Sequence, residues 1–188
     1  MEKQETLWFI KKEIPHLRRF ARSLSGDATS ADDLVQDTLE RALRKHKKWS
    51  PEKGSMRVWL FKMMQNIFIN KTQKQKRQGT HIDVTDLPGT THDTPQRREM
   101  SQDERVRTHD VLRSFGHLPE EQRHALTLVA IEGLRYEDAA QVLGVAIGTV
   151  RSRVARARTF LRVRHLKEGH PDVVPLTARN ANKNTKKV

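Results

Sequence analysis

The sequence contains no cysteine. The chain can therefore form no disulfide bond, no metal site with thiolate ligands and no cysteine nucleophile. Long apolar runs are missing as well, since none approaches the roughly 20 residues that span a bilayer. The short run at residues 7–10 ends at the charged residues 11–13, which makes it too short for the core of a signal peptide. These absences predict a cytoplasmic protein with no membrane insertion.

Catalytic motifs are also missing. The sequence has no glycine-rich phosphate loop and no nucleophile flanked by glycines. Among the nine histidines, His117 and His124 share a predicted helix start, but no third ligand accompanies them. Asp32 and Asp33 are adjacent, so on a helix their side chains point about 100° apart and cannot face one substrate together. We therefore expect neither an enzyme nor a protein with a metal or cofactor.

Acidic residues are outnumbered by basic ones, 23 to 36, which gives a net charge of +13 at pH 7. Such an excess favours a polyanionic partner, because each cation placed on a phosphate releases counterions. The excess alone does not distinguish DNA from RNA or from an anionic membrane. The charge is uneven along the chain: residues 1–77 and 104–165 are basic, and residues 78–103 are acidic.

The most informative stretch runs from Tyr136 to Leu161. A short first helix ends at Gly144, the residue type that best adopts a left-handed C-cap, and a second helix is predicted from about Ala146 to Arg164. A short helix, a glycine turn and a basic second helix form the helix-turn-helix pattern, whose second helix can enter the major groove of DNA. The alternative is an ordinary helical hairpin with a solvated basic face. The predicted DNA contacts are Thr149, Arg151, Ser152, Arg153, Arg156 and Arg158.

Two helices are predicted before residue 50. Apolar residues at helical spacing mark the first over residues 6–25, and Pro15 either begins this helix or divides it. The second helix starts at Ser30, with Asp33 three residues on as its capping partner. Its exposed face is acidic, which suits the N-terminal end of the helix dipole. The residues of this face are Asp32, Asp33, Gln36, Asp37 and Glu40.

A third helix is predicted from Ser55, its cap, to about Gln78, after a turn at residues 50–54. Trp59 is expected in its core. Asparagine and lysine side chains on the other face can stack on or hydrogen-bond to exposed bases and phosphates, although a solvated helix end would look similar. The candidates on this face are Arg57, Lys62, Asn66, Asn70, Lys71 and Lys74.

Residues 79–101 show no apolar period, which predicts a flexible linker with a root-mean-square span of about 25 Å. That reach allows the flanking segments to spread apart or to close on each other. Two helices follow, one over about 101–115 and one opened by Pro119, with Ile131 on its buried side. The predicted fold class is all-α, with two small helical domains at 1–78 and 102–166, the linker at 79–101 and a disordered basic tail at 167–188.

Several motifs together resemble the extracytoplasmic-function (ECF) sigma factors of bacteria. They are residues 31–38 (ADDLVQDT), 59–62 (WLFK) with Asn66, 132–140 (EGLRYEDAA) and 148–158 (GTVRSRVARAR). A lone helix-turn-helix would fit many regulators, but this combination is specific to the family. The first domain is similar to the general-stress branch found in alphaproteobacteria.

The resemblance implies a sigma-2-like domain and a sigma-4-like domain that bind core RNA polymerase and direct it to promoters. The acidic helix face at residues 32–40 would dock on the polymerase. Residues 50–70 would read and help open the −10 element of promoter DNA, because a loop before a basic helix can hold an unstacked base. The second helix of the helix-turn-helix would read the −35 element. The family also implies an anti-sigma factor that contacts both domains.

Two alternative functions would each explain only part of the sequence. A sigma mimic that titrates an anti-sigma factor would leave the arginines of residues 151–158 unused, and a plain operator-binding regulator would not explain residues 1–77. The family often has proline where Ala146 stands and a larger aliphatic residue where Ala139 stands. These departures predict looser packing in the second domain.

Overall fold

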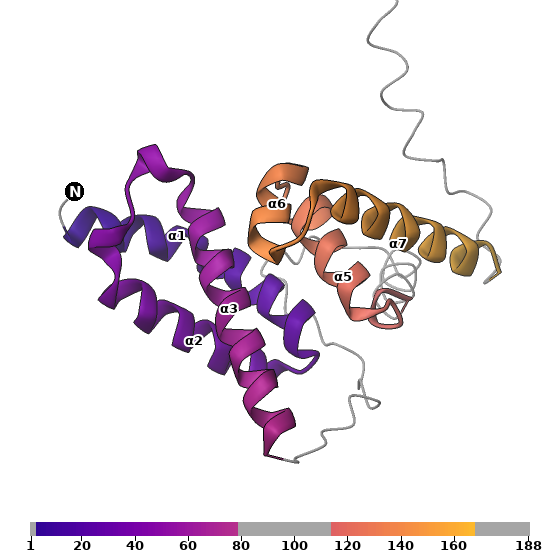
Figure 1. Ribbon diagram of the computed structural model, residues 1–188, viewed down its shortest axis with the longest axis horizontal. Coiled ribbons are helices and arrows are strands. Elements are labelled where there is room, and N and C mark those ends of the chain that lie inside the picture. Colours follow the sequence, from indigo (N-terminus) through magenta and orange to yellow (C-terminus); the bar gives the residue numbers. More distant parts are fainter. Residues whose placement is uncertain (1–2, 79–113, 168–188) are drawn as a thin grey trace, which may run out of the picture.

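The computed structural model describes residues 3–78 and 114–167, and all regular structure within them is helical (Figure 1). The predicted all-α fold is therefore confirmed. The predicted linker and nearly all of the predicted tail lie outside the described residues, so the domain boundaries stay predictions. The elements are α1 (Lys3–Ser25), α2 (Ala28–Arg44), η1 (His46–Lys48), η2 (Pro51–Lys53), α3 (Met56–Arg77), α5 (Glu120–Leu126), η3 (Thr127–Ile131), α6 (Tyr136–Leu143) and α7 (Ile147–Lys167).

The helices α1, α2 and α3 form one bundle, in which each packs against the other two. The rings of Phe20 and Phe61 meet at its centre with their centroids 5.0 Å apart. The apolar stripes predicted for α1 and α2 line this core except near their ends, where Leu7 and Leu43 are exposed. The largest side chains buried in the bundle are Leu17, Phe20, Leu60, Phe61 and Met64.

Two helix boundaries differ from the prediction. α1 continues through Pro15, whose exposed ring faces away from the bundle, because packing of the flanking turns compensates for the missing backbone donor. α2 begins at Ala28 and is capped by Asp27, not by Ser30. The Asp27 carboxylate accepts the backbone N–H of Ser30 at 2.8 Å, and this bond lowers the pKa of Asp27. The predicted cap of α3 is confirmed, since the Ser55 hydroxyl accepts the backbone N–H of Val58 at 3.2 Å.

The helices α5, α6 and α7 form a second unit, in which α7 packs on both of the others. α5 follows Pro119 and continues into the wider turns of η3, where the N–H of Glu132 donates to the carbonyl of Thr127, five residues earlier. Wider turns shift the phase of the side chains around the helix. Ile131 is consequently 49% exposed, and the prediction that it is buried was wrong.

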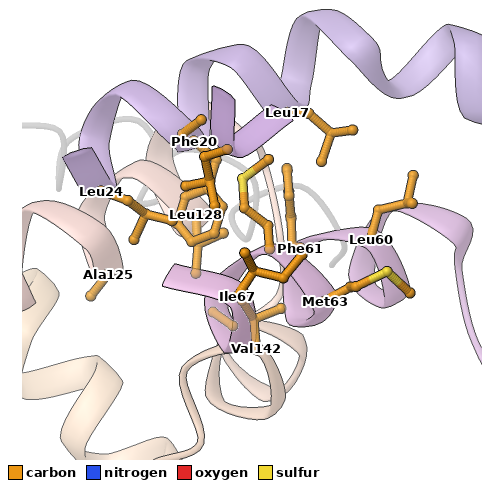
Figure 2. Close-up of a cluster of buried hydrophobic side chains, with 14 of the residues drawn as sticks. Leu17, Phe20, Leu24, Leu60, Phe61, Met63, Ile67, Ala125, Leu128 and Val142 are labelled. Atoms are coloured by element: carbon orange, nitrogen blue, oxygen red, sulfur yellow. The ribbon is translucent and has the colours of Figure 1, made fainter. Parts of the chain in front are cut away.

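The two units pack against one another. α6 lies against α3, while α5 and η3 lie against α1. Figure 2 shows the continuous core that results, to which Phe20 and Phe61 of the first unit and Leu128 and Val142 of the second contribute. We call this the closed arrangement. It is one of the two arrangements that the length of the predicted linker allows.

Candidate polymerase and nucleic-acid interfaces

The helix α7 presents an arginine face to solvent. Gly144 ends α6 in the left-handed conformation, with φ 66°, and turns the chain into α7, as predicted from the sequence. Val150, Val154 and Ala157 are buried against the rest of the second unit. The opposite side of α7 therefore points outward, and Figure 1 shows this helix at the edge of the molecule. The predicted DNA contacts that are exposed on it are Arg151, Arg156 and Arg158.

The other predicted DNA contacts of α7 are less exposed to solvent and are engaged by neighbouring groups. The side chain of Arg153 is only 16% exposed, and its guanidinium lies 2.6 Å from a carboxylate oxygen of Glu121 on α5. Ser152 is half-buried and donates its hydroxyl to the carbonyl of Thr149, which is also half-buried. Arg153 thus braces α7 against α5 in this arrangement, and its contact with DNA stays a prediction.

The helix α2 carries the predicted polymerase-binding residues on one continuous face. Successive side chains turn by about 100°, so the five polar positions span less than half of the helix circumference. Asp33 is exposed, and Gln36 donates its side-chain amide to Glu40 at 3.3 Å. Asp32 lies 3.6 Å from Arg18 of α1, and Asp37 pairs with Lys71 of α3. We call residues 32, 33, 36, 37 and 40 the acidic surface.

A shallow open pocket of about 330 Å³ lies where the end of α2 and η1 meet α3. Lys62 and Asn66, both predicted from the sequence, form one wall of it. Trp59 is half-buried and belongs to the lining, although a core position was expected for it. The cations of the opposite wall were not predicted, although the basic run at residues 44–48 could have indicated them. We call this the cationic pocket, and its lining is Arg41, Lys45, Lys48, Trp59, Lys62, Met63 and Asn66.

The remaining predicted residues of α3 lie elsewhere. Asn70 and Lys74 are exposed further along the helix, and Lys71 is engaged by Asp37 of the acidic surface. Arg57 projects from another face of α3, about 140° around the helix from Lys62. It reaches the junction between the two units and stands apart from the cationic pocket.

At that junction, a buried carboxylate of the second unit is held by the first. The side chain of Glu132 has no exposed surface. The Arg19 guanidinium donates to both of its oxygens, at 2.7 and 3.2 Å, and His16 Nδ1 lies 2.5 Å from one of them. Arg57 donates to the backbone carbonyl of Glu132 at 3.4 Å and to the Glu13 carboxylate at 2.6 Å. We call these five residues the interdomain cluster.

A second contact between the units involves Arg123 and His124 of α5. Both side chains are buried, and Arg123 donates through Nε to the carbonyl of Ser23 near the end of α1 at 2.9 Å. The rings of His124 and Phe68 of α3 are nearly perpendicular, with centroids 6.2 Å apart. Burial lowers the pKa of His124 from 6.5 to about 4, and repulsion by Arg123 adds to this effect. The imidazole is therefore neutral at pH 7.

Comparison with known proteins gives a consistent result along the chain. Residues 10–65 match the family model for the sigma-2 domain of PhyR, and residues 108–161 match the model for sigma-70 region 4. The chain is 38% identical over 166 residues to the ECF RNA polymerase sigma factor EcfG of Rhodopseudomonas palustris, and the match covers 88% of each protein. The chain belongs to the ECF family of RNA polymerase sigma factors. Like other sigma factors, it binds core RNA polymerase and directs promoter recognition and transcription initiation.

Other relatives agree with this assignment. The chain is 32% identical over 153 residues to the ECF sigma factor SigE of Mycolicibacterium smegmatis, covering 81% of this chain and 58% of that protein. The sigma factor RpoE of Bartonella quintana, solved in complex with the anti-sigma factor NepR, superposes with a TM-score of 0.68 at 36% identity, over 88% of this chain and 96% of RpoE. These likenesses confirm the general-stress branch predicted for this sigma factor. No helix in the described ranges is long and apolar enough to cross a membrane.

The lowered pKa of His124 predicts how the stability of this sigma factor depends on pH. Between about pH 6.5 and 4 the unfolded chain binds a proton that the folded chain resists, so the free energy of unfolding falls as the pH falls through this window. The expected loss is about 2 kcal/mol between pH 7 and pH 5. Urea unfolding at the two pH values measures it. The variant His124→Phe keeps a ring against Phe68 and should lose less stability on acidification, whereas equal losses in both proteins would contradict the assignment.

Proposed function

We propose that this sigma factor binds core polymerase and the two promoter elements through three separate surfaces, and that it is regulated through the closed arrangement. The acidic surface docks on core polymerase, the cationic pocket captures an unstacked base of the −10 element, and α7 reads the −35 element. An anti-sigma factor inhibits the protein by stabilising the closed arrangement. In each of these steps the chain acts as an initiation factor that binds and positions, without catalysis. The observation that carries the proposal is the exposed arginine face of α7 on one unit, combined with a tryptophan-lined cationic pocket on the other.

The pocket has the chemistry that single-stranded DNA requires. Its cations can track a phosphate backbone, and an aromatic ring such as that of Trp59 can stack on any base. Asn66 adds an amide that can donate to and accept from a base edge. Stacking is worth about 1–3 kcal/mol per base, which helps to offset the cost of unpairing the duplex.

The exposed arginines of α7 lead to a prediction for the −35 element. We expect Arg151→Ala to weaken binding to a duplex that carries this element by about 1–3 kcal/mol if the arginine reads a base, and to relax specificity at one position. A phosphate contact would instead weaken binding to all sequences alike and reduce the salt slope. Fluorescence anisotropy at several salt concentrations distinguishes these outcomes.

The control for this measurement is Arg44→Ala, which removes another exposed arginine, from the first unit. Its affinity for the duplex should match that of the wild type. If Arg151→Ala and Arg156→Ala together leave the affinity unchanged, α7 does not read the −35 element.

The closed arrangement is too compact to contact both promoter elements. The −10 and −35 elements are centred about 25 base pairs apart, which is roughly 85 Å along B-DNA. A compact body of about 130 residues has a radius of gyration near 14 Å. The two units must therefore separate on the promoter, and any ligand that binds the closed arrangement better shifts the population away from this open state.

An anti-sigma factor is the partner that would hold the two units in the closed arrangement. RpoE, which is similar to this chain in fold, was solved in complex with such a partner, the anti-sigma factor NepR. A partner that touches both units of this chain would favour closure by its differential affinity for the two arrangements. It would bind the intact chain more tightly than either unit alone, because linked units raise the effective concentration.

A second candidate function is a sigma mimic that titrates an anti-sigma factor. It is favoured by the match of residues 10–65 to the sigma-2 domain of PhyR, since PhyR of Bartonella quintana is described as an anti-anti-sigma factor. A mimic has no use for DNA-reading side chains, whereas α7 carries exposed arginines in series. The sigma factor is therefore the better supported function.

Reconstituted transcription separates the two functions. Purified chain is mixed with core RNA polymerase and a library of promoter templates, and run-off transcripts are sequenced. A sigma factor yields transcripts from a defined set of promoters, and adding the anti-sigma factor suppresses them. If no template is transcribed above core polymerase alone, while the chain still releases a sigma factor from inhibition, the mimic is the correct function.

A further inference from the structure

The loop that joins η1 to α3 lies at the edge of the cationic pocket. It comprises residues 49–55 and follows directly on Lys48, which lines the pocket. It ends at Ser55, the cap of α3, the helix that supplies the facing wall of the pocket. Pro51, Glu52 and Gly54 are exposed on its rim. We call this segment the 49–55 loop.

A side chain at the start of the loop closes it onto its end. Trp49 is 9% exposed, and its indole Nε1–H donates to the carbonyl of Gly54 at 3.2 Å. The N–H of Gly54 in turn donates to the carbonyl of Pro51, also at 3.2 Å. The loop is thus tied across its base by a tryptophan side chain and within its rim by the backbone.

Gly54 makes this closure possible through its backbone conformation. Its φ is 117° and its ψ is 177°, a region that only glycine occupies without strain. A Cβ atom added there would meet no atom within 4 Å. A side chain at this position would therefore be resisted by the backbone alone and not by a neighbouring group.

The N-terminal part of α1 supports the loop from beneath. The ring of Phe9 lies against that of Trp49, with centroids 6.2 Å apart and the planes tilted by 50°. This contact holds the indole in place while its N–H reaches Gly54. We call the hydrogen bond between Trp49 and Gly54 the clasp. It connects the folded bundle to the rim of the pocket.

We propose that the bond between Trp49 and Gly54 is a positioning device for promoter opening, which holds the rim of the 49–55 loop beside the cationic pocket before DNA arrives. A flexible loop would have to be ordered when it captures a base, at a cost in conformational entropy. A loop that is already ordered avoids this cost in the opening step. The inference rests on the proposed role of the pocket at the −10 element.

The variant Trp49→Phe tests the clasp because it keeps an aromatic ring against Phe9 and removes the N–H donor together with one of the two fused indole rings. On a duplex promoter we expect the rate of open-complex formation to fall about five- to tenfold, the effect of losing one hydrogen bond. Affinity for core polymerase and for a duplex with the −35 element should not change. A template that is already unpaired across the −10 element should restore transcription to the wild-type level. Trp8→Phe makes the same change at an exposed tryptophan of α1 and keeps a ring beside Phe9, which makes it the matched control.

The variant Gly54→Ala disturbs the same clasp from its other end. It should give the same phenotype, and the double variant should be no slower than the single variants, because both remove one interaction. A loop with a merely structural role would give additive losses that persist on the unpaired template. Wild-type opening rates in Trp49→Phe would overturn the clasp alone, whereas a wild-type chain that starts no transcription with core polymerase would overturn the proposed function first.

Discussion

Replacing Glu132 with lysine is expected to open the chain and raise its radius of gyration in solution. The Glu132 carboxylate is fully buried and accepts two hydrogen bonds from Arg19 and a contact from His16. A lysine at this position would place an ammonium group beside Arg19 and Arg57, and only Arg57 would keep an anion, the Glu13 carboxylate. Breaking one partner of a buried ion pair costs about 3–5 kcal/mol, and the lower end applies because Arg19 is 41% exposed.

The energetic cost of breaking the ion pair sets how far the equilibrium between closed and open chains shifts. A shift of about 3 kcal/mol changes the ratio of closed to open chains more than a hundredfold. Small-angle X-ray scattering of the purified variant should therefore show an expanded chain whose helicity is retained. The same variant should bind the anti-sigma factor more weakly, because part of the binding energy is spent on closing the chain.

A charge swap controls for general damage to the fold. Arg19→Glu in the Glu132→Lys background restores an ion pair of opposite polarity and should return the chain to its compact size. Glu52→Lys makes the same charge change at an exposed position on η2 and should leave the size unaltered. An equally compact Glu132→Lys variant would mean that the apolar contacts alone hold the units together.

Reversing two charges on the acidic surface is expected to abolish binding to core polymerase. Asp33 is exposed and Asp37 lies about 40° from it around α2, so Asp33→Arg with Asp37→Arg replaces two anions by two cations on one face. Like charges placed opposite each other across an interface cost several kcal/mol, which predicts a loss of affinity of at least a hundredfold. Binding is measured by titration of labelled chain with core polymerase.

The fold should survive this double change. Charge changes at exposed positions away from the core usually alter stability by less than 0.5 kcal/mol, although Asp37 also gives up its ion pair with Lys71. Circular dichroism should therefore give wild-type helicity, and Glu137→Arg on α6 serves as a control with an unchanged polymerase affinity. Wild-type affinity in the double variant would place the docking surface elsewhere on the chain.

The sequence predicted local structure better than it predicted which charged residues meet. Gly144 and the apolar spacing of α7 define a helix-turn-helix without further information, because caps and stripes depend on neighbours in the chain. Arg57 was predicted as a contact to the −10 element and Glu132 was given no role, because each has its partner on another helix, far away in the sequence. Arg153 was grouped with the DNA contacts for the same reason, although Glu121 engages it. The π-helical turns of η3 likewise depend on tertiary packing, so no pattern in the sequence indicated them.

The distance between the two units during initiation tests the central claim that the free chain is closed and opens on the promoter. Because the sequence has no cysteine, cysteines introduced at the exposed positions Gln75 on α3 and Thr159 on α7 are unique sites for a pair of fluorophores. Single-molecule energy transfer should be high in the free chain and with the anti-sigma factor. It should fall to a low value when the chain joins core polymerase on a promoter. Transfer that stays high in a transcribing complex, or that is already low in the free chain, would contradict the account.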